Sequence, residues 1–208
     1  MPANYDHIAG IYDFLSRIIF GRHIVQAQVC FLRYIPADSR VLIVGGGTGW
    51  ILDKLSDEHP QGLEIDYVES SAQMIALSQR RNFKENTVNF IHLPIEDFSI
   101  DKQYDVIITP FLFDNFPSAK LESVFAKLDP ALKTNGLWLY TDFVCDKNKS
   151  PLWQKLLLRV MYLFFRITSN IEARELISME KYFAQSYSIE FDSLRYFKFI
   201  RSVVYRKN

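Results

Sequence analysis

The chain has 208 residues and a formal net charge of zero, with 24 basic and 24 acidic side chains. Apolar residues make up 49% of it, which excludes a disordered chain and suits one α/β domain with a sizeable core. The two cysteines, Cys30 and Cys145, exclude a disulfide framework, and the four histidines lack metal-ligand spacing, so we expect no metal. Without a leader-like N-terminus or a spanning apolar run, a cytoplasmic location is expected.

The charge is unevenly distributed along the chain. Residues 1–146 carry 12 basic and 19 acidic side chains, whereas residues 147–208 carry 12 and 5. Such a basic surplus more often forms a solvated surface, and otherwise faces an anionic partner such as lipid headgroups or nucleic acid. We expect no nucleic-acid partner.

The elements in chain order begin with two helices, over residues 3–19 and 22–34, which are separated by Gly21. Alternating strands and helices follow, which predicts a doubly wound, mostly parallel sheet with helices on both faces. The expected strands are 40–45, 63–68, 88–92, 104–109 and 135–142, and the helices between them are 49–58, 71–82 and 117–132. After a long helix over 151–168 and a short one near 178–184, residues 186–193 and 196–206 predict an antiparallel hairpin.

The first strand runs directly into a glycine-rich loop, Gly45-Gly46-Gly47-Thr48-Gly49. A strand, a tight turn and a helix N-terminus in this order cradle a nucleotide-like ligand. The glycine spacing differs from the dinucleotide fingerprint, because Trp50 stands where the third glycine is required. A phosphate-binding P-loop is excluded as well, because no Gly-Lys-Ser/Thr follows.

Glu69 ends the second expected strand, about 20 residues after the glycine loop. A carboxylate at the carboxyl end of a strand can accept hydrogen bonds from both hydroxyls of a ribose. Alternatively, Glu69 caps the helix that follows it, since acids favour helix N-termini. Both roles can hold together.

Residues 41–142 resemble the core of class I S-adenosylmethionine-dependent methyltransferases. Five segments in the family's order carry the resemblance: Gly45-x-Gly47-Thr48-Gly49, Tyr67-Val68-Glu69-Ser70-Ser71-x-x-Met74-Ile75, Phe90-Ile91-x-x-x-Ile95-Glu96-Asp97-Phe98, Tyr104-Asp105-Val106-Ile107-Ile108 and Leu132-x-x-x-Gly136-Leu137-Trp138-Leu139. The N-terminus is similar to ubiquinone/menaquinone-biosynthesis C-methyltransferases, through Tyr5-Asp6-x-Ile8-Ala9-x-Ile11-Tyr12-Asp13 and Phe20-Gly21-Arg22-His23. The resemblance implies one seven-stranded domain over 1–208, with a helical cap (1–36), a cofactor-binding core (37–146), a helical insertion (147–184) and a C-terminal hairpin (185–208).

The resemblance also implies S-adenosylmethionine as cofactor and assigns residues to it. Ile95 would pack on the adenine, Thr109 would lie near the transferring methyl, and Tyr12 would belong to a lid, with plain helix packing as its alternative. The full set of expected cofactor residues is Gly45, Gly47, Thr48, Gly49, Glu69, Ser70, Ile95, Glu96, Thr109 and Tyr12.

Two residues depart from the family's pattern. Ile43 stands where the family usually has an acid, and Leu93-Pro94-Ile95 replaces a common Gly-Asp-Ala. The acid normally helps to hold the glycine loop, so the departure predicts weaker cofactor binding that Ile43→Asp restores in part.

Asp114 is the expected general base, because it follows the fourth strand at the mouth of the crevice. Its alternative role is to cap the helix that begins near Pro117. No Asn-Pro-Pro-Tyr-type motif follows the fourth strand, which disfavours methylation of adenine or glutamine amino groups.

The helix over 151–168 is apolar almost all round, apart from one stripe of Lys155, Arg159 and Arg166. Its wide apolar face needs cover from the sheet, a partner copy, a membrane surface or a greasy substrate. In the substrate interpretation, an acceptor pocket is lined by Trp153, Met161 and Phe165.

The leading hypothesis is methyl transfer from S-adenosylmethionine to a small, apolar or aromatic acceptor. A non-catalytic S-adenosylmethionine-binding regulator or subunit is one alternative. An aminopropyltransferase-like enzyme is another, although no Asp-rich polyamine site follows the fourth strand.

Overall fold

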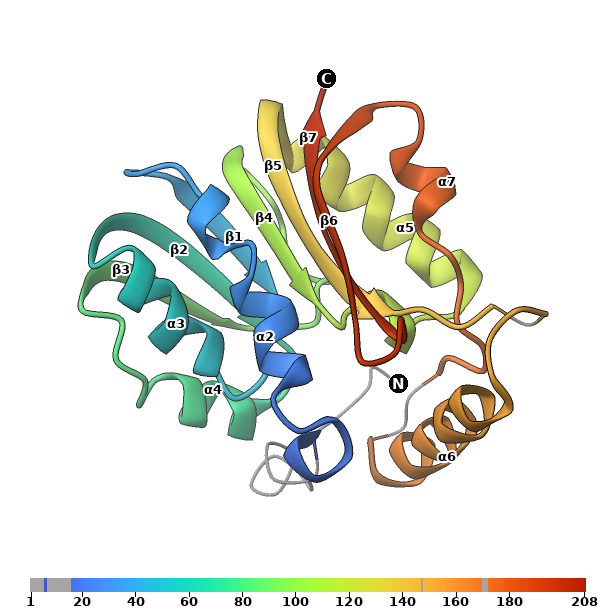
Figure 1. Ribbon diagram of the computed structural model, residues 1–208. Helices are drawn as coiled ribbons and strands as arrows, with labels where there is room; N and C mark the ends of the chain where they lie inside the picture. Colours follow the sequence, from blue (N-terminus) through green and yellow to red (C-terminus); the bar gives the residue numbers. More distant parts are fainter. Residues whose placement is uncertain (1–5, 7–15, 147, 170–171) are drawn as a thin grey trace.

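The protein folds around one seven-stranded sheet with the strand order β3-β2-β1-β4-β5-β7-β6. The computed structural model describes residues 6, 16–146, 148–169 and 172–208 (Figure 1). The strands are β1 (Arg40–Val44), β2 (Gln61–Glu69), β3 (Glu85–His92), β4 (Tyr104–Pro110), β5 (Leu132–Phe143), β6 (Tyr187–Arg195) and β7 (Ile200–Lys207). The helices are α2 (His23–Val29), α3 (Trp50–Glu58), α4 (Ala72–Ser78), α5 (Ser118–Leu128), α6 (Leu152–Ser169) and α7 (Glu180–Phe183), with 3₁₀ turns η1 (Leu32–Tyr34), η2 (Phe113–Asn115) and η3 (Asp129–Ala131).

The expected fold class is confirmed. Strands β1 to β5 pair in parallel, and β7 lies antiparallel between β5 and β6. From β1 the sheet is extended outward in one direction by β2 and β3, and from β4 it is extended in the other direction by β5. β1 and β4 are parallel neighbours at this change of direction, so a crevice forms outside their carboxyl ends. The glycine loop follows β1 at this switch point.

Several expected boundaries shift by a few residues. The helix expected over 117–132 ends at Leu128, because Pro130 has no N–H to continue it and the chain turns through η3 into β5. The helix expected over 22–34 divides into α2 and the 3₁₀ turn η1. Of the helix expected over 3–19, residues 6 and 16–19 are described: residues 16–19 are helical, whereas Asp6 lies in a turn.

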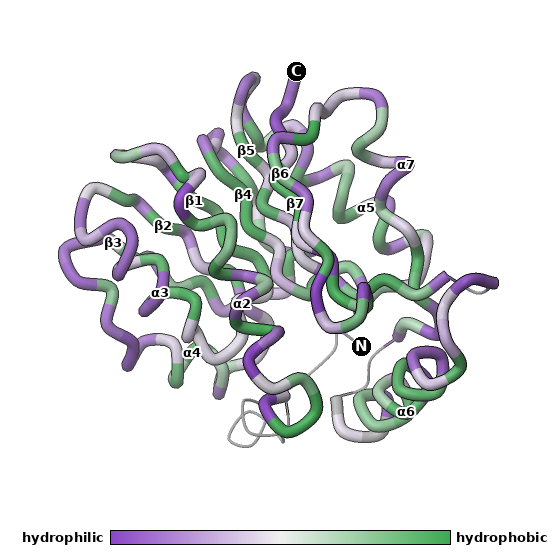
Figure 2. The backbone as a smooth tube through the Cα atoms, in the orientation of Figure 1, coloured by the Kyte–Doolittle hydropathy of each residue, from purple (hydrophilic) through white to green (hydrophobic). Residues whose placement is uncertain are grey.

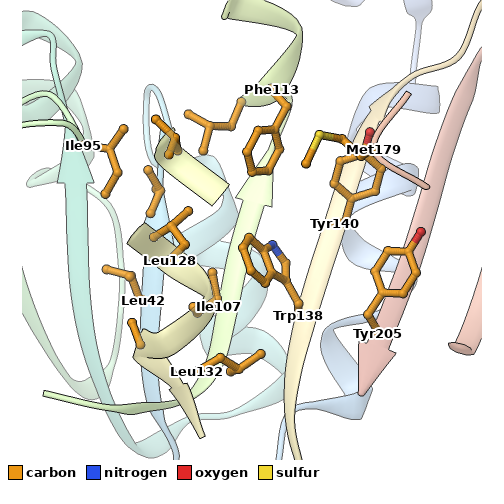
Figure 3. Packing of buried hydrophobic residues seen from close by; sticks show 14 of the residues in the cluster. Leu42, Ile95, Ile107, Phe113, Leu128, Leu132, Trp138, Tyr140, Met179 and Tyr205 are labelled. Carbon is orange, nitrogen blue, oxygen red and sulfur yellow. The ribbon is translucent and has the colours of Figure 1, made fainter. Parts of the chain in front are cut away.

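Apolar side chains cover the central strands on both faces. Figure 3 shows one face, where Trp138, Tyr140 and Phe113 lie together with Tyr205. Trp138 also stacks on Phe125 of α5, with ring centroids 5.2 Å apart. The opposite face packs against α3. The strands are therefore fixed from both sides, and the loops at their carboxyl ends start from rigid positions.

Helix α6 lies apart from the helices that cover the sheet, beside the β6–β7 turn (Figure 1). Met161 belongs to a third core cluster, with Phe20, Phe143 and Phe199. Within the described segments, no helix is long and apolar enough to cross a membrane.

Candidate active site

A cavity of about 310 Å³ lies at the carboxyl ends of β1, β2 and β4. The glycine loop and the end of β2 form one wall, and the loop after β3 forms a second. The turn η2 and one face of α6 close the other side. Among the lining residues are Gly45, Gly46, Gly47, Thr48, Glu69, Ser70, Ile95, Glu96, Asp114, Lys120, Leu157, Met161, Phe164 and Phe165.

The glycine loop has a backbone that L-residues with side chains rarely adopt. Gly45 and Gly47 have φ values of +71° and +63°. A Cβ on Gly47 would meet only the Met74 sulfur at 4.0 Å, so this backbone borders open space. A Cβ on Gly46 would lie 2.4 Å from the hydroxyl oxygen of Tyr67. The loop is thus open to a ligand at Gly47, whereas at Gly46 the Tyr67 ring occupies the adjacent space.

Glu69 fastens the loop from the neighbouring strand. Its Oε2 accepts a hydrogen bond from the Gly47 amide at 3.1 Å, and its Oε1 accepts one from the Ser71 amide at 3.0 Å. Burial raises the pKa of the Glu69 carboxyl. The N-cap of α4 is Ser71, whose Oγ accepts from the Met74 amide at 3.1 Å. Glu69 therefore borders the cavity and orients the loop, whereas helix capping falls to Ser71.

Three expected cofactor residues lie elsewhere or outside the described residues. Gly49 begins α3 with φ +77°, and a Cβ there would lie 2.5 Å from the Cβ of Ser78, so it packs α3 against α4. Thr109 is fully buried, and its Oγ1 accepts a hydrogen bond from Trp138 Nε1 at 2.9 Å. Neither is among the cavity residues. Tyr12 lies outside the described residues.

Asp6 contacts the start of α4, next to the carboxyl end of β2. Its Oδ1 accepts hydrogen bonds from Ser71 Oγ at 2.6 Å and from the Gln73 amide at 3.1 Å. Sequence reasoning missed this contact, because an acid 65 positions away carries no local signal.

Asp114 lines the cavity and has a second acid, Asp142, as its neighbour. Asp142 Oδ2 accepts a hydrogen bond from the Asp114 amide at 3.3 Å, and Asn115 Nδ2 donates to Asp114 Oδ1 at 2.7 Å. Burial raises the pKa of both carboxyls, to about 7 for Asp142, and the charge of Asp142 raises the pKa of Asp114 further. The N-cap of α5 is Pro117, so Asp114 does not cap that helix.

Helix α6 presents Met161 and Phe165 to the cavity, together with Leu157 and Phe164. Trp153 is absent from the described lining residues. It lies eight residues before Met161, which is about 12 Å along the helix, and its ring packs edge-on against Phe197 at 5.7 Å. The expectation for Trp153 therefore needs correction, because the start of α6 meets the β6–β7 turn.

Lys120 is a cavity residue that the sequence did not reveal. Its Nζ lies 2.5 Å from Glu96 Oε1 and 3.5 Å from Glu172 Oε2. It joins the loop after β3 to the segment that follows α6. Sequence spacing gave no signal, because the three residues come from separate parts of the chain.

These residues fit S-adenosylmethionine. Because Gly47 has no side chain, the backbone there leaves room beside the loop. Glu69 offers a buried carboxylate at the end of β2, and Ile95 provides an apolar wall. A donor with a charged sulfonium, two ribose hydroxyls and a flat base needs these three features. When bound, it supplies the activated methyl group.

The sheet order, the glycine loop after β1 and the acid ending β2 together define a class I S-adenosylmethionine-dependent methyltransferase. A family model described as "Methyltransferase domain" matches residues 42–138, a little under half of the chain. The expected family and cofactor are confirmed, and the aminopropyltransferase alternative finds no support in the match.

Curated relatives include two malonyl-[acyl-carrier protein] O-methyltransferases. The protein from Ilyobacter polytropus is 29% identical over 143 residues, which are 69% of this chain and 53% of the relative. The protein from Priestia megaterium is 35% identical over 50% of this chain and 36% of the relative. The aligned part thus spans about half of these relatives or less. Neither is a quinone C-methyltransferase, and that narrower resemblance stays a prediction.

Solved structures share the fold at low identity. The DhpI–SAH complex has a TM-score of 0.69 and 17% identity, covering 98% of this chain and 93% of that one. CalO1, a methyltransferase in calicheamicin biosynthesis, has a TM-score of 0.64 and 18% identity, with coverage of 95% and 56%.

Proposed function

We propose that the protein transfers a methyl group from S-adenosylmethionine to a small, apolar or aromatic acceptor that carries an ionisable hydroxyl or carbon. One observation carries the proposal: a single cavity is lined both by the glycine loop and by the apolar face of α6. A donor on the loop and an acceptor under α6 would share that space, as in-line transfer requires.

Asp114 is the proposed general base. As the acceptor bonds to the methyl carbon and the carbon–sulfur bond breaks, the acceptor's proton passes to the Asp114 carboxylate. Burial and the neighbouring Asp142 raise the pKa of this carboxyl, so the base is charged over a larger fraction of molecules as pH rises. The rate should therefore rise with pH over a range well above that in which an ordinary carboxyl titrates.

The charges around the cavity favour a neutral acceptor over a carboxylate. Glu69, Glu96 and Asp114 line it, and among the described lining residues the one cation is Lys120. That lysine already pairs with Glu96 and Glu172. A malonyl-type carboxylate, the acceptor named for the relatives, would meet the acids Glu69 and Asp114 and a lysine that is already paired with Glu96 and Glu172.

The test measures S-adenosylhomocysteine formation with a panel of phenols, quinols with short prenyl chains, and a malonyl thioester. We expect turnover with apolar hydroxyl acceptors, and a kcat about 10²–10⁴-fold lower in Asp114→Asn. Calorimetry should show cofactor affinity nearly unchanged in that variant. Cofactor binding without turnover on any acceptor indicates a non-catalytic subunit, and turnover with the malonyl thioester alone indicates carboxylate methylation. Either result overturns the proposal.

A further inference from the structure

We propose that the outer face of α6, the β6–β7 turn and the helical residues before α2 form one surface that docks on an anionic lipid bilayer. The docking face consists of Ile18, Leu152, Leu156, Val160, Leu163 and Phe197. This inference concerns where the protein binds, and it holds or fails independently of the acceptor proposed above.

Helix α6 is mostly apolar along its length (Figure 2), and its apolar residues lie both toward the cavity and toward solvent. Met161 and Phe165 face the cavity, whereas Leu152, Leu156 and Leu163 are 83%, 63% and 58% exposed. A helix that merely covers a core presents polar residues outward. Three leucines in solvent on one side of one helix need cover from outside the chain.

Two other segments extend this face. Gln154 Nε2 donates to the Phe197 carbonyl at 2.8 Å, and the Tyr196 hydroxyl donates to the Ile19 carbonyl at 2.8 Å. These bonds connect the β6–β7 turn both to the start of α6 and to the residues before α2, and Phe197 and Ile18 in these neighbouring segments are exposed. Exposed large apolar residues therefore occur on three segments that contact one another, which is the basis for assigning them to one docking face.

The β6–β7 turn holds Phe197 outward at a conformational cost. Tyr196, Phe197 and Lys198 have φ values of +47°, +56° and +67°. Residues with side chains rarely adopt this region, and three in a row persist only where the surroundings enforce it. A strained turn that exposes an aromatic ring suits insertion into a lipid interface, where an aromatic side chain lies at headgroup depth.

Charge identifies the partner as anionic. Residues 16–30, 151–169 and 194–200 together contain seven Lys or Arg and no Asp or Glu. On α6, the stripe formed by Arg159 and Arg166 flanks the leucines at 100° per residue. A two-fold contact with a second copy would bring these like charges together, whereas anionic headgroups would neutralise them.

The cavity opens at this face. Ile19 and Val160 both line the cavity and are exposed. An apolar molecule dissolved in the bilayer would reach the cavity past these residues.

The test is flotation of the full chain with vesicles of phosphatidylcholine alone or with phosphatidylglycerol added. We expect binding to the anionic vesicles, which 0.5 M salt weakens, and little binding to phosphatidylcholine alone. Arg159→Gln combined with Arg166→Gln should weaken partitioning roughly 30-fold. Leu156→Glu combined with Leu163→Glu should abolish it.

A matched control replaces two exposed arginines elsewhere, Arg33→Gln with Arg80→Gln, and should bind as the wild type does. Circular dichroism checks that all variants fold. No binding to anionic vesicles, or equal loss in the control, overturns the proposal. So does a wild-type dimer in analytical ultracentrifugation that Leu156→Glu dissociates, because a second copy would then cover the face.

Discussion

Tyr67 closes over Gly46: its hydroxyl oxygen lies 2.4 Å from where a Cβ on that glycine would stand. The same hydroxyl donates a hydrogen bond to the Gly47 carbonyl at 3.0 Å. Tyr67 is the parallel-register partner of Ile43, the position at which related sequences usually carry an acid. The loop is therefore fastened from β2 by the Tyr67 phenol and by the Glu69 carboxyl.

Tyr67→Phe should destabilise the fold by about 1 kcal/mol, because the partly buried Gly47 carbonyl loses its donor. Gly46→Ala should cost roughly 1–3 kcal/mol through overpacking against the ring. Combining Gly46→Ala with Tyr67→Leu should cost less than the sum of the two single changes. Urea unfolding of the wild type, Gly46→Ala, Tyr67→Leu and the double variant measures this, and strict additivity would disprove the contact.

Ile43→Asp should destabilise the protein by roughly 3–5 kcal/mol, the scale for an unpaired buried charge. The sequence alone predicted improved cofactor binding for this change. The structure alters that prediction, because Ile43 is fully buried in the core cluster that contains Tyr67 and Ile108. Ile43→Val, at about 1 kcal/mol, is the control. A stable Ile43→Asp protein with tighter cofactor binding would restore the earlier interpretation.

Glu69→Ala should weaken S-adenosylmethionine binding by roughly 1–3 kcal/mol. The Gly47 amide would lose its hydrogen-bond acceptor, and the ligand would lose a buried carboxylate. Calorimetry measures the change. Glu64→Ala, on the same strand but exposed and paired with Arg40, is the matched control and should leave affinity unchanged. Equal affinities for all three proteins would remove Glu69 from the site.

Asp142→Asn should flatten the pH dependence of stability. Burial raises the pKa of Asp142 from 3.8 to about 7, so between these values the folded state holds a proton that the unfolded state releases. The stability from this proton is complete below about pH 4 and is lost as pH rises through 7. The free energy of unfolding of the wild type should thus fall from pH 4 to pH 8 relative to the variant. Parallel curves would contradict the raised pKa.

The sequence predicts the sheet and the glycine loop well, because both depend on local signals: apolar strands, punctuating glycines and an acid at a fixed distance. Contacts between distant segments left no such signal. The pairing of Lys120 with Glu96, the approach of Asp142 to Asp114, and the packing of Trp153 against the β6–β7 turn required coordinates. Periodicity shows that α6 is apolar all round, but which face meets the cavity depends on where the helix is anchored.

The position of β7 has a consequence for how the chain is assembled. Although β7 follows β6 in the sequence, it lies between β5 and β6 and pairs with both. Until residues 200–207 arrive, β5 offers an unpaired edge whose outward N–H and C=O groups can recruit any extended peptide. Trp138 and Leu139 lie on that edge, and both are completely buried once β7 is in place. A nascent chain or a truncated form that lacks this strand should therefore aggregate through β5, even with its cofactor loop already formed.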